Sequence, residues 1–195
     1  MFALTSKTTM LVLIGVAIAA AAVIFWYMRT YHFREIDPGK LYRDVLRNGT
    51  EFANACRKGH IRSIISLVSD EEYTSTRFAP AMAAARARQI RTLRVPIPLG
   101  GWPTTDDVQQ FLRLATDPAN QPAIVHCREG VRRTGMLASA YRISIMGMSK
   151  EQAKAAIETF GHSRRSIGDI EKFIDLYDPG TRSVAYPATM PKGDE

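Results

Sequence analysis

The chain has 195 residues and a formal net charge of +7 at pH 7, and residues 1–32 differ sharply in composition from the rest. Two cysteines are too few for a disulfide scaffold. No zinc-finger, helix-turn-helix or RNA-binding motif accompanies the positive charge, so nucleic acid is not a predicted partner. The charge instead indicates an anionic membrane surface or an anionic substrate.

The N-terminal segment is predicted to be a membrane anchor. Residues 11–28 carry no charge and end in the aromatic group Phe25-Trp26-Tyr27, which is typical of a membrane interface. About 18 helical residues rise about 27 Å, close to the thickness of a bilayer core. A cleaved signal peptide is the alternative, but bulky residues stand where its small-residue cleavage site is expected. Basic residues after the segment favour a single pass with a cytoplasmic domain, although Lys7 and the amino terminus compete on the other side.

The sequence is predicted to divide into three parts. These are an anchor with its juxtamembrane segment (1–32), one domain (33–178) and a loose tail (179–195). Periodicity and turn residues within the domain predict a series of short elements. In chain order these are a strand or turn pair over 33–43, a helix over 50–58, a strand over 62–68, a helix over 80–89 and a strand over 91–97.

A loop over 100–107 then leads into a helix capped by Thr104 or Thr105. The stripe expected to be buried on that helix comprises Val108, Phe111, Leu112 and Ala115. A strand over 122–126 follows, and then helices over 134–146, 149–160 and 167–177. Strands that alternate with helices predict an α/β domain with a mainly parallel sheet, in which ligands bind beyond the carboxyl ends of the strands.

The segment from His126 to Gly135 carries the most specific chemistry. Cys127 and Arg133 enclose five residues between an apolar strand and the start of a helix. A loop of this length can direct successive backbone N–H groups, and the positive end of the helix, at one anion. Gly130 allows the tight turn that this requires.

This environment favours the thiolate form of Cys127, which is the nucleophilic form. Arg133 adds a planar guanidinium fork that matches two phosphoryl oxygens. Thr134 can donate a hydrogen bond to the sulfur as a leaving group, and His126 is expected to order the loop rather than to act as a base. Cys56 has none of these neighbours and is expected to be a packing residue.

The pattern His126-Cys127-x5-Arg133-Thr134-Gly135 resembles the cysteine-dependent protein tyrosine and dual-specificity phosphatase superfamily. Further similarities to small, atypical dual-specificity phosphatases are found at 41–43, 64–67, 96–98 and 170–173. The resemblance is to a bacterial-looking, membrane-anchored form and covers about residues 33–177. It implies a sheet of four or five strands flanked by helices, no metal or other cofactor, and two-step hydrolysis of phosphomonoesters. The residues expected to bind the substrate are Arg128, Glu129, Gly130, Val131, Arg132 and Thr134.

The proton donor to the leaving group is less clearly marked. Trp102-Pro103 resembles the superfamily's Trp-Pro-Asp loop, but Thr104 stands in place of the aspartate. Asp106 is the predicted general acid. Asp107 and Asp169 are alternatives, and all three also fit roles in the first turn or cap of a helix.

The substrate stays open between phosphoproteins and inositol phosphates or phosphoinositides. Arg128 and Arg132 predict a basic rim that suits several phosphate groups. Two competing hypotheses are a catalytically dead phosphate-binding module at the membrane, and a rhodanese-type sulfurtransferase or arsenate reductase. The Arg-Thr-Gly continuation into a helix argues against the last of these.

Overall fold

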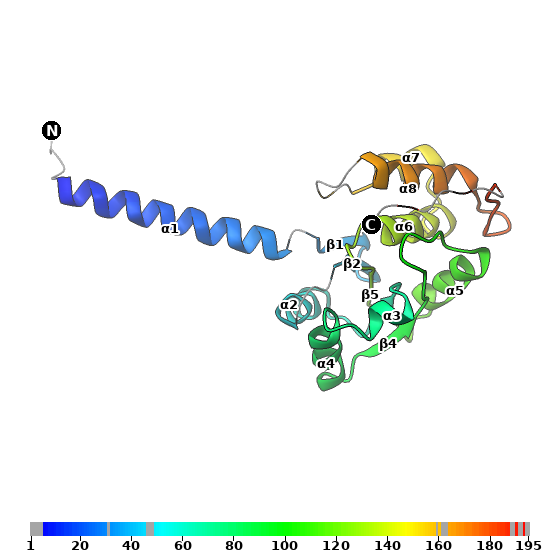
Figure 1. Cartoon of the computed structure of the whole chain (residues 1–195), viewed down its shortest axis with the longest axis horizontal. Coiled ribbons are helices and arrows are strands. Elements are labelled where there is room, and N and C mark those ends of the chain that lie inside the picture. Colours follow the sequence, from blue (N-terminus) through cyan, green and yellow to red (C-terminus); the bar gives the residue numbers. More distant parts are fainter. Residues whose placement is uncertain are drawn as a thin grey trace. The chain divides into compact units, whose positions relative to one another are not determined.

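The computed structural model describes residues 6–30, 32–45, 49–158, 160, 164–187, 190 and 193. It divides the chain into two compact units, Met1–Tyr31 and His32–Glu195. The first unit contains the helix α1 (Ser6–Thr30), and the second contains the remaining elements (Figure 1).

The structure overturns the prediction of a single-pass membrane protein with a cytoplasmic domain. Within the described part of the chain, no helix combines the length and the apolar character that crossing a bilayer requires.

The second unit is built on a five-stranded sheet in the order β1-β2-β5-β3-β4. Its strands are β1 (Arg34–Asp37), β2 (Leu41–Asp44), β3 (Ser63–Ser66), β4 (Arg91–Arg94) and β5 (Ala123–His126). β1 and β2 form an antiparallel hairpin, and the pairs β2–β5, β5–β3 and β3–β4 are parallel. The predicted mainly parallel α/β sheet is therefore confirmed, with one antiparallel edge strand.

Helices cover both faces of this sheet. They are α2 (Gly49–Gly59), α3 (Asp70–Tyr73), α4 (Ala79–Ala87), α5 (Thr105–Thr116), α6 (Arg132–Ser144), α7 (Lys150–Ala155) and α8 (Arg164–Leu176). One hydrophobic cluster joins α2 and α4 to one face, through residues such as Phe52, Met82 and Ile124. The larger cluster joins α5, α6 and α8 to the other face, through residues such as Phe111 and Phe173.

The local predictions for α5 hold. Thr104 caps the helix through a capping box with Asp107, and the four predicted stripe residues are all buried. The helix predicted over 149–160 ends at Ala155 instead, whereas α8 begins three residues earlier than expected. The short helix α3 was not predicted.

Part of the predicted loose tail packs on the domain. The strand β7 (Ser183–Val184) pairs with β6 (Tyr177–Asp178), and the Tyr186 hydroxyl donates to the Pro103 carbonyl over 2.8 Å. Tyr186 also meets the Trp102 ring edge-on, with ring centroids 5.5 Å apart. Residues 188–189, 191–192 and 194–195 of the tail lie outside the described residues.

Candidate active site

The loop between β5 and α6 lies at the middle of the sheet's carboxyl edge. β5 is hydrogen-bonded to β2 on one side and β3 on the other, and Cys127 follows its last residue. α6 begins at Arg132, so its positive N-terminal end faces the same loop. The structure thus brings the predicted nucleophile, the loop and the helix end together.

Gly130 is required by the shape of this loop. Its φ of +69° lies in the left-handed region, which L side chains rarely adopt. A Cβ atom there would lie 3.1 Å from the Asp44 carbonyl oxygen at the end of β2. The loop therefore packs directly on the neighbouring strand, and only glycine allows this approach without strain.

Arg133 is fully buried and is held by a carboxylate that sequence reasoning missed. Its Nη1 and Nη2 donate to Glu72 Oε2 and Oε1 over 2.7 and 3.1 Å, and Nη1 also donates to the Ile97 carbonyl over 2.9 Å. Burial raises the pKa of Glu72, but the hydrogen bonds from Arg133 and from the Ser69 N–H outweigh it. The net pKa lies below its usual range, so Glu72 is a carboxylate at neutral pH.

The position of Glu72 has a local origin. Ser69 caps α3 and Glu72 completes a capping box, with the Ser69 N–H donating to Glu72 Oε2 over 3.0 Å. The pattern Ser-x-x-Glu directly after the apolar strand was the signal available in the sequence. It predicts a helix start, but not that the glutamate meets an arginine 61 residues later.

Two further arginines outside the loop contact it, and neither was predicted as a site residue. Arg43 on β2 is buried and donates to the Gly130 and Val131 carbonyls. Arg77, between α3 and α4, donates to the Arg128 carbonyl and to Glu129.

His126 is buried and lies beside the loop as a neutral ring. Its Nδ1 is 3.3 Å from the Cys127 carbonyl oxygen, and its Nε2 has no hydrogen-bond partner among the described residues. Burial, aided by the charge of Arg133 and opposed by the Cys127 contact, lowers the pKa of His126 to about 4. The neutral ring packs beside the loop, and a role in ordering the loop stays the prediction for His126.

We expect this histidine to make the domain sensitive to acid. An unfolded histidine has a pKa near 6.5, so between pH 6.5 and about 4 the unfolded chain binds a proton that the folded chain does not. The stability present above pH 6.5 is therefore lost as the pH falls, by about 2 kcal/mol between pH 7 and pH 5. Urea unfolding at both values should show a smaller loss for His126→Asn. An equal loss in the variant would contradict this expectation.

The residues predicted to bind substrate occupy different environments. Arg128 is exposed over 41 % of its side chain, and Glu129 pairs with Arg77 over 2.9 Å. Arg132 is only 1 % exposed, so its side chain does not form the predicted basic rim. Thr134 is buried, and its hydroxyl has no hydrogen-bond partner among the described residues, which leaves it available to the Cys127 sulfur.

Arg132 instead ties the loop to the segment that precedes α5. Its Nε donates to Asp169 over 2.6 Å, and its Nη1 donates to the Gly101 carbonyl over 2.6 Å. Its guanidinium lies over the Trp102 ring, 4.7 Å from the centroid. Burial of this arginine against three partners explains why it is absent from the rim.

The three candidate acids are now distinguished by their contacts. The Asp107 carboxylate accepts hydrogen bonds from the Thr104 N–H and hydroxyl, both over 2.8 Å, so it serves as a helix cap. Asp169 is engaged by Arg132. Asp106 is exposed, and its carboxylate has no hydrogen bond or ion pair with any described residue.

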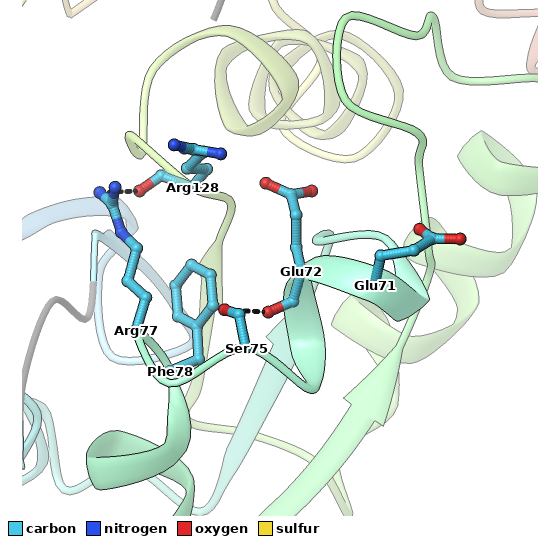
Figure 2. Close-up of a pocket in the computed structure, with 6 residues that line it drawn as sticks. All are labelled: Glu71, Glu72, Ser75, Arg77, Phe78 and Arg128. Atoms are coloured by element: carbon cyan, nitrogen blue, oxygen red, sulfur yellow. Dashed lines mark hydrogen bonds between the residues drawn. The ribbon is translucent and has the colours of Figure 1, made fainter.

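A pocket of about 290 Å³ opens beside the loop (Figure 2). It is lined by Glu71, Glu72, Ser75, Arg77, Phe78 and Arg128. Two carboxylates and two guanidinium groups give it a mixed charge. Cys127 and Arg133 are themselves fully buried. No group of three or more histidine, cysteine or acidic side chains able to hold a metal occurs within the described residues.

Both cysteines are free thiols. Cys56 is half-buried and packs against the cluster formed with α2 and α4, as predicted. Burial raises its pKa to about 11, so this thiol stays protonated and inert at neutral pH.

Comparisons with known proteins agree with this geometry. The family model described as "DSP-PTPase phosphatase fused to NAD+ Kinase" matches residues 52–174. The dual specificity protein phosphatase TpbA of Pseudomonas aeruginosa is 25% identical over 135 residues, which are 69% of this chain and 55% of that protein. The chain thus spans about half the length of this curated relative.

Two solved structures share the fold. The catalytic core of the PP-IP phosphatase SIW14 from S. cerevisiae superposes with a TM-score of 0.63 at 21% identity, covering 75% of this chain and 85% of that one. P. aeruginosa TpbA in complex with pTyr gives a TM-score of 0.59 at 21% identity, covering 77% and 93%.

Proposed function

Because this chain belongs to the family of DSP-PTPase phosphatases, we propose that it hydrolyses phosphomonoesters through a cysteinyl-phosphate on Cys127. We place this activity in residues 33–178. The observation that carries the proposal is the position of Cys127, which directly follows the central strand β5 and shares its loop with Arg133 and the start of α6. A bacterial source is part of the proposal, and the Pseudomonas relative supports it.

The reaction takes two displacements at phosphorus. The Cys127 thiolate attacks the phosphorus, an S–P bond forms, and the ester P–O bond breaks as the leaving oxygen takes a proton from the general acid. Water then attacks the phosphorus, gives its proton to the same carboxylate, and releases the thiolate and inorganic phosphate. Backbone N–H groups of the loop and the Arg133 fork neutralise the equatorial phosphoryl oxygens in both steps.

Turnover by the full chain tests this proposal. Release of p-nitrophenol from p-nitrophenyl phosphate is expected without added metal, with inorganic phosphate as a competitive inhibitor. A chain that is stabilised by phosphate against heat but releases no phenol is a phosphate-binding module instead. Transfer of sulfur from thiosulfate to cyanide would indicate a sulfurtransferase.

Asp106 is the general acid in this proposal. Among the three candidates, its carboxylate alone is not bound by another described residue, whereas Asp107 caps α5 and Asp169 binds Arg132. Arg132 supports the assignment because it fixes the segment before α5 against the phosphate loop through Gly101 and Trp102. Asp106 lies only four residues after Trp102 in the sequence.

Replacement of Asp106 by asparagine is expected to lower kcat about 100-fold for phenyl phosphate and far less for p-nitrophenyl phosphate. The reason is that p-nitrophenolate leaves readily without a proton, whereas phenolate does not. Steady-state rates with both esters measure this dependence. Asp169→Asn is the matched comparison, since loss of its pair with Arg132 should lower both rates alike. A leaving-group dependence in Asp169→Asn, but not in Asp106→Asn, would assign the acid to Asp169.

Phosphorylated protein side chains are the proposed substrates, with inositol phosphates or phosphoinositides as the second candidate. The pTyr complex of TpbA supports the first class, and the PP-IP phosphatase SIW14 supports the second. Arg128 and Arg77 beside the pocket both lie within ion-pair distance of Glu129, and Glu71 and Glu72 also line the pocket, so its charge favours neither class. A panel of phosphotyrosyl peptides and inositol phosphates, ranked by kcat/KM, decides between them.

A further inference from the structure

We propose that Arg43 and Arg77 are positioning residues that orient the peptide groups of the phosphate loop, by holding its carbonyl oxygens on the side away from the anion. The inference rests on the proposed function of the loop as a phosphoryl-binding site. Neither arginine belongs to the Cys-x5-Arg segment, and the two reach the loop from different elements.

Arg77 holds the first part of the loop. Its Nη2 donates to the Arg128 carbonyl over 3.0 Å (Figure 2). The same Nη2 donates to Glu129 Oε1 over 2.9 Å. Figure 2 shows the Arg77 guanidinium below the loop, with the Arg128 carbonyl directed at it. One guanidinium group therefore fixes both the backbone and the side chain of consecutive residues.

Arg43 holds the second part of the loop. Its Nη2 donates to the Gly130 carbonyl and also lies 3.4 Å from the Val131 carbonyl oxygen. Its side chain is only 1 % exposed, so the Gly130 carbonyl exchanges a hydrogen bond with water for one with a fixed cation. The Val131 carbonyl also accepts from the Gly135 N–H over 2.6 Å, at the start of α6.

The consequence for the anion site follows from peptide geometry. In a planar trans peptide, the N–H of the next residue points opposite to the C=O. Carbonyls of Arg128 and Gly130 that are held by arginines therefore direct the N–H groups of Glu129 and Val131 to the other side of the loop. N–H groups on one side of such a loop form the concavity that binds a phosphoryl group.

Arg43 is itself fixed by a partly buried carboxylate. Glu158 pairs with Arg43 and also accepts hydrogen bonds from Arg142 over 2.6 and 3.3 Å. Burial raises the pKa of Glu158, but the charges of Arg43 and Arg142 outweigh it and hold that pKa below its usual range. The carboxylate therefore stays charged at neutral pH, and Arg43 is stacked in addition against the Phe160 ring, 5.0 Å from its centroid.

Arg142 provides a matched control for Arg43. It is also buried and also pairs with Glu158. Among the described residues, its other hydrogen bond is to the Ala156 carbonyl and none is to the loop. Arg91 provides the control for Arg77. It is an exposed arginine that donates to one backbone carbonyl, that of Ala119. It is the first residue of β4, so it lies at the amino edge of the sheet, opposite the carboxyl edge where the loop lies.

Binding of inorganic phosphate to the full chain, measured by calorimetry, tests the inference together with kcat/KM for an aryl phosphate. Arg77→Met is expected to weaken phosphate binding about 10-fold and to lower kcat/KM about 30-fold, because the N–H groups meet more charge in the transition state. Arg43→Met is expected to lower kcat/KM about 100-fold, with partial recovery in Arg43→Lys. Arg91→Met and Arg142→Met are expected to bind phosphate as the wild type does.

Salt dependence separates orientation from charge alone. A purely long-range effect of the Arg77 charge is screened by salt, whereas a misdirected N–H group stays misdirected. The inference is overturned when the Arg77→Met defect disappears at high salt, or when Arg77→Met and Arg43→Lys both bind phosphate like the wild type. Equal defects in the controls overturn it as well.

Arg77→Met and Arg43→Lys keep the inference testable even where Arg43→Met does not fold, because position 77 is partly exposed and Arg43→Lys keeps the positive charge.

Failure of the proposed function and failure of this inference give different results. A wild-type chain that binds phosphate without turnover refutes the function, and the variants still report on the loop through the phosphate dissociation constant. A wild-type chain that neither binds phosphate nor turns over refutes both.

Discussion

Replacement of Cys127 by serine is expected to abolish turnover, with a loss of at least about 10⁴-fold in kcat. A serine hydroxyl is not ionised at neutral pH in this loop, and no described side chain is placed to remove its proton: the neighbouring His126 has its pKa lowered to about 4 by burial, and its Nδ1 faces the Cys127 carbonyl. Steady-state kinetics with an aryl phosphate measure the loss.

The variant should bind inorganic phosphate as well as the wild type, because the loop and Arg133 are unchanged. Cys56→Ser is the matched control, since Cys56 is the second free thiol and packs away from the loop. A Cys127→Ser chain that keeps wild-type turnover would exclude the cysteinyl-phosphate mechanism.

Replacement of Glu72 by glutamine is expected to be the most damaging change outside the loop itself. Removal of one partner from a buried ion pair leaves the other charge uncompensated, at a cost of about 3 kcal/mol in the free energy of unfolding. The Arg133 guanidinium also loses the two-oxygen contact that fixes its plane. A displaced guanidinium holds the phosphoryl oxygens less well, which lowers kcat by about 100-fold. Urea unfolding and steady-state kinetics on the same preparations measure the two effects.

Asp70→Asn is the control for this change. Asp70 lies on the same short helix and pairs with Arg94 over 2.8 Å, but its side chain is 77 % exposed, so its pair should contribute at most about 1 kcal/mol. The alternative is that Glu72 occupies the Arg133 guanidinium and keeps it from binding the substrate's phosphoryl oxygens. That alternative predicts a higher kcat/KM for Glu72→Gln, and such an increase would refute the role of Glu72 in positioning Arg133.

The loop between β5 and α6 was predictable because the residues that define it lie in one uninterrupted stretch. Cys127, Gly130, Arg133 and the start of α6 are separated by only a few residues, so the strand, turn and helix signals appear together in the sequence. The sheet was predictable for a similar reason, since its parallel strands are short and apolar and alternate with amphipathic helices.

The residues that support the loop could not be predicted in the same way. Arg43 comes from β2 and Glu72 from α3, and Glu158, after α7, acts only through its pair with Arg43. No local pattern states which partner each of them will meet. A polar residue in a strand or at a helix cap can be explained by its neighbours in the sequence. Only the folded structure shows that it also forms an ion pair with a residue far away in the sequence. Arg132 illustrates the converse error, because a basic residue within the loop was expected at the surface and is buried.

The strand order has a consequence for the way the protein is made. The hairpin β1–β2 and the pair β3–β4 precede β5 in the chain, yet β5 lies between them, so each half of the sheet has an unpaired inner edge until β5 is inserted. During synthesis on the ribosome, Cys127 emerges together with the strand that closes this gap. A nascent chain that stops before β5 therefore has two unpaired strand edges and lacks Cys127, and chaperones that shield strand edges should bind it until β5 has emerged.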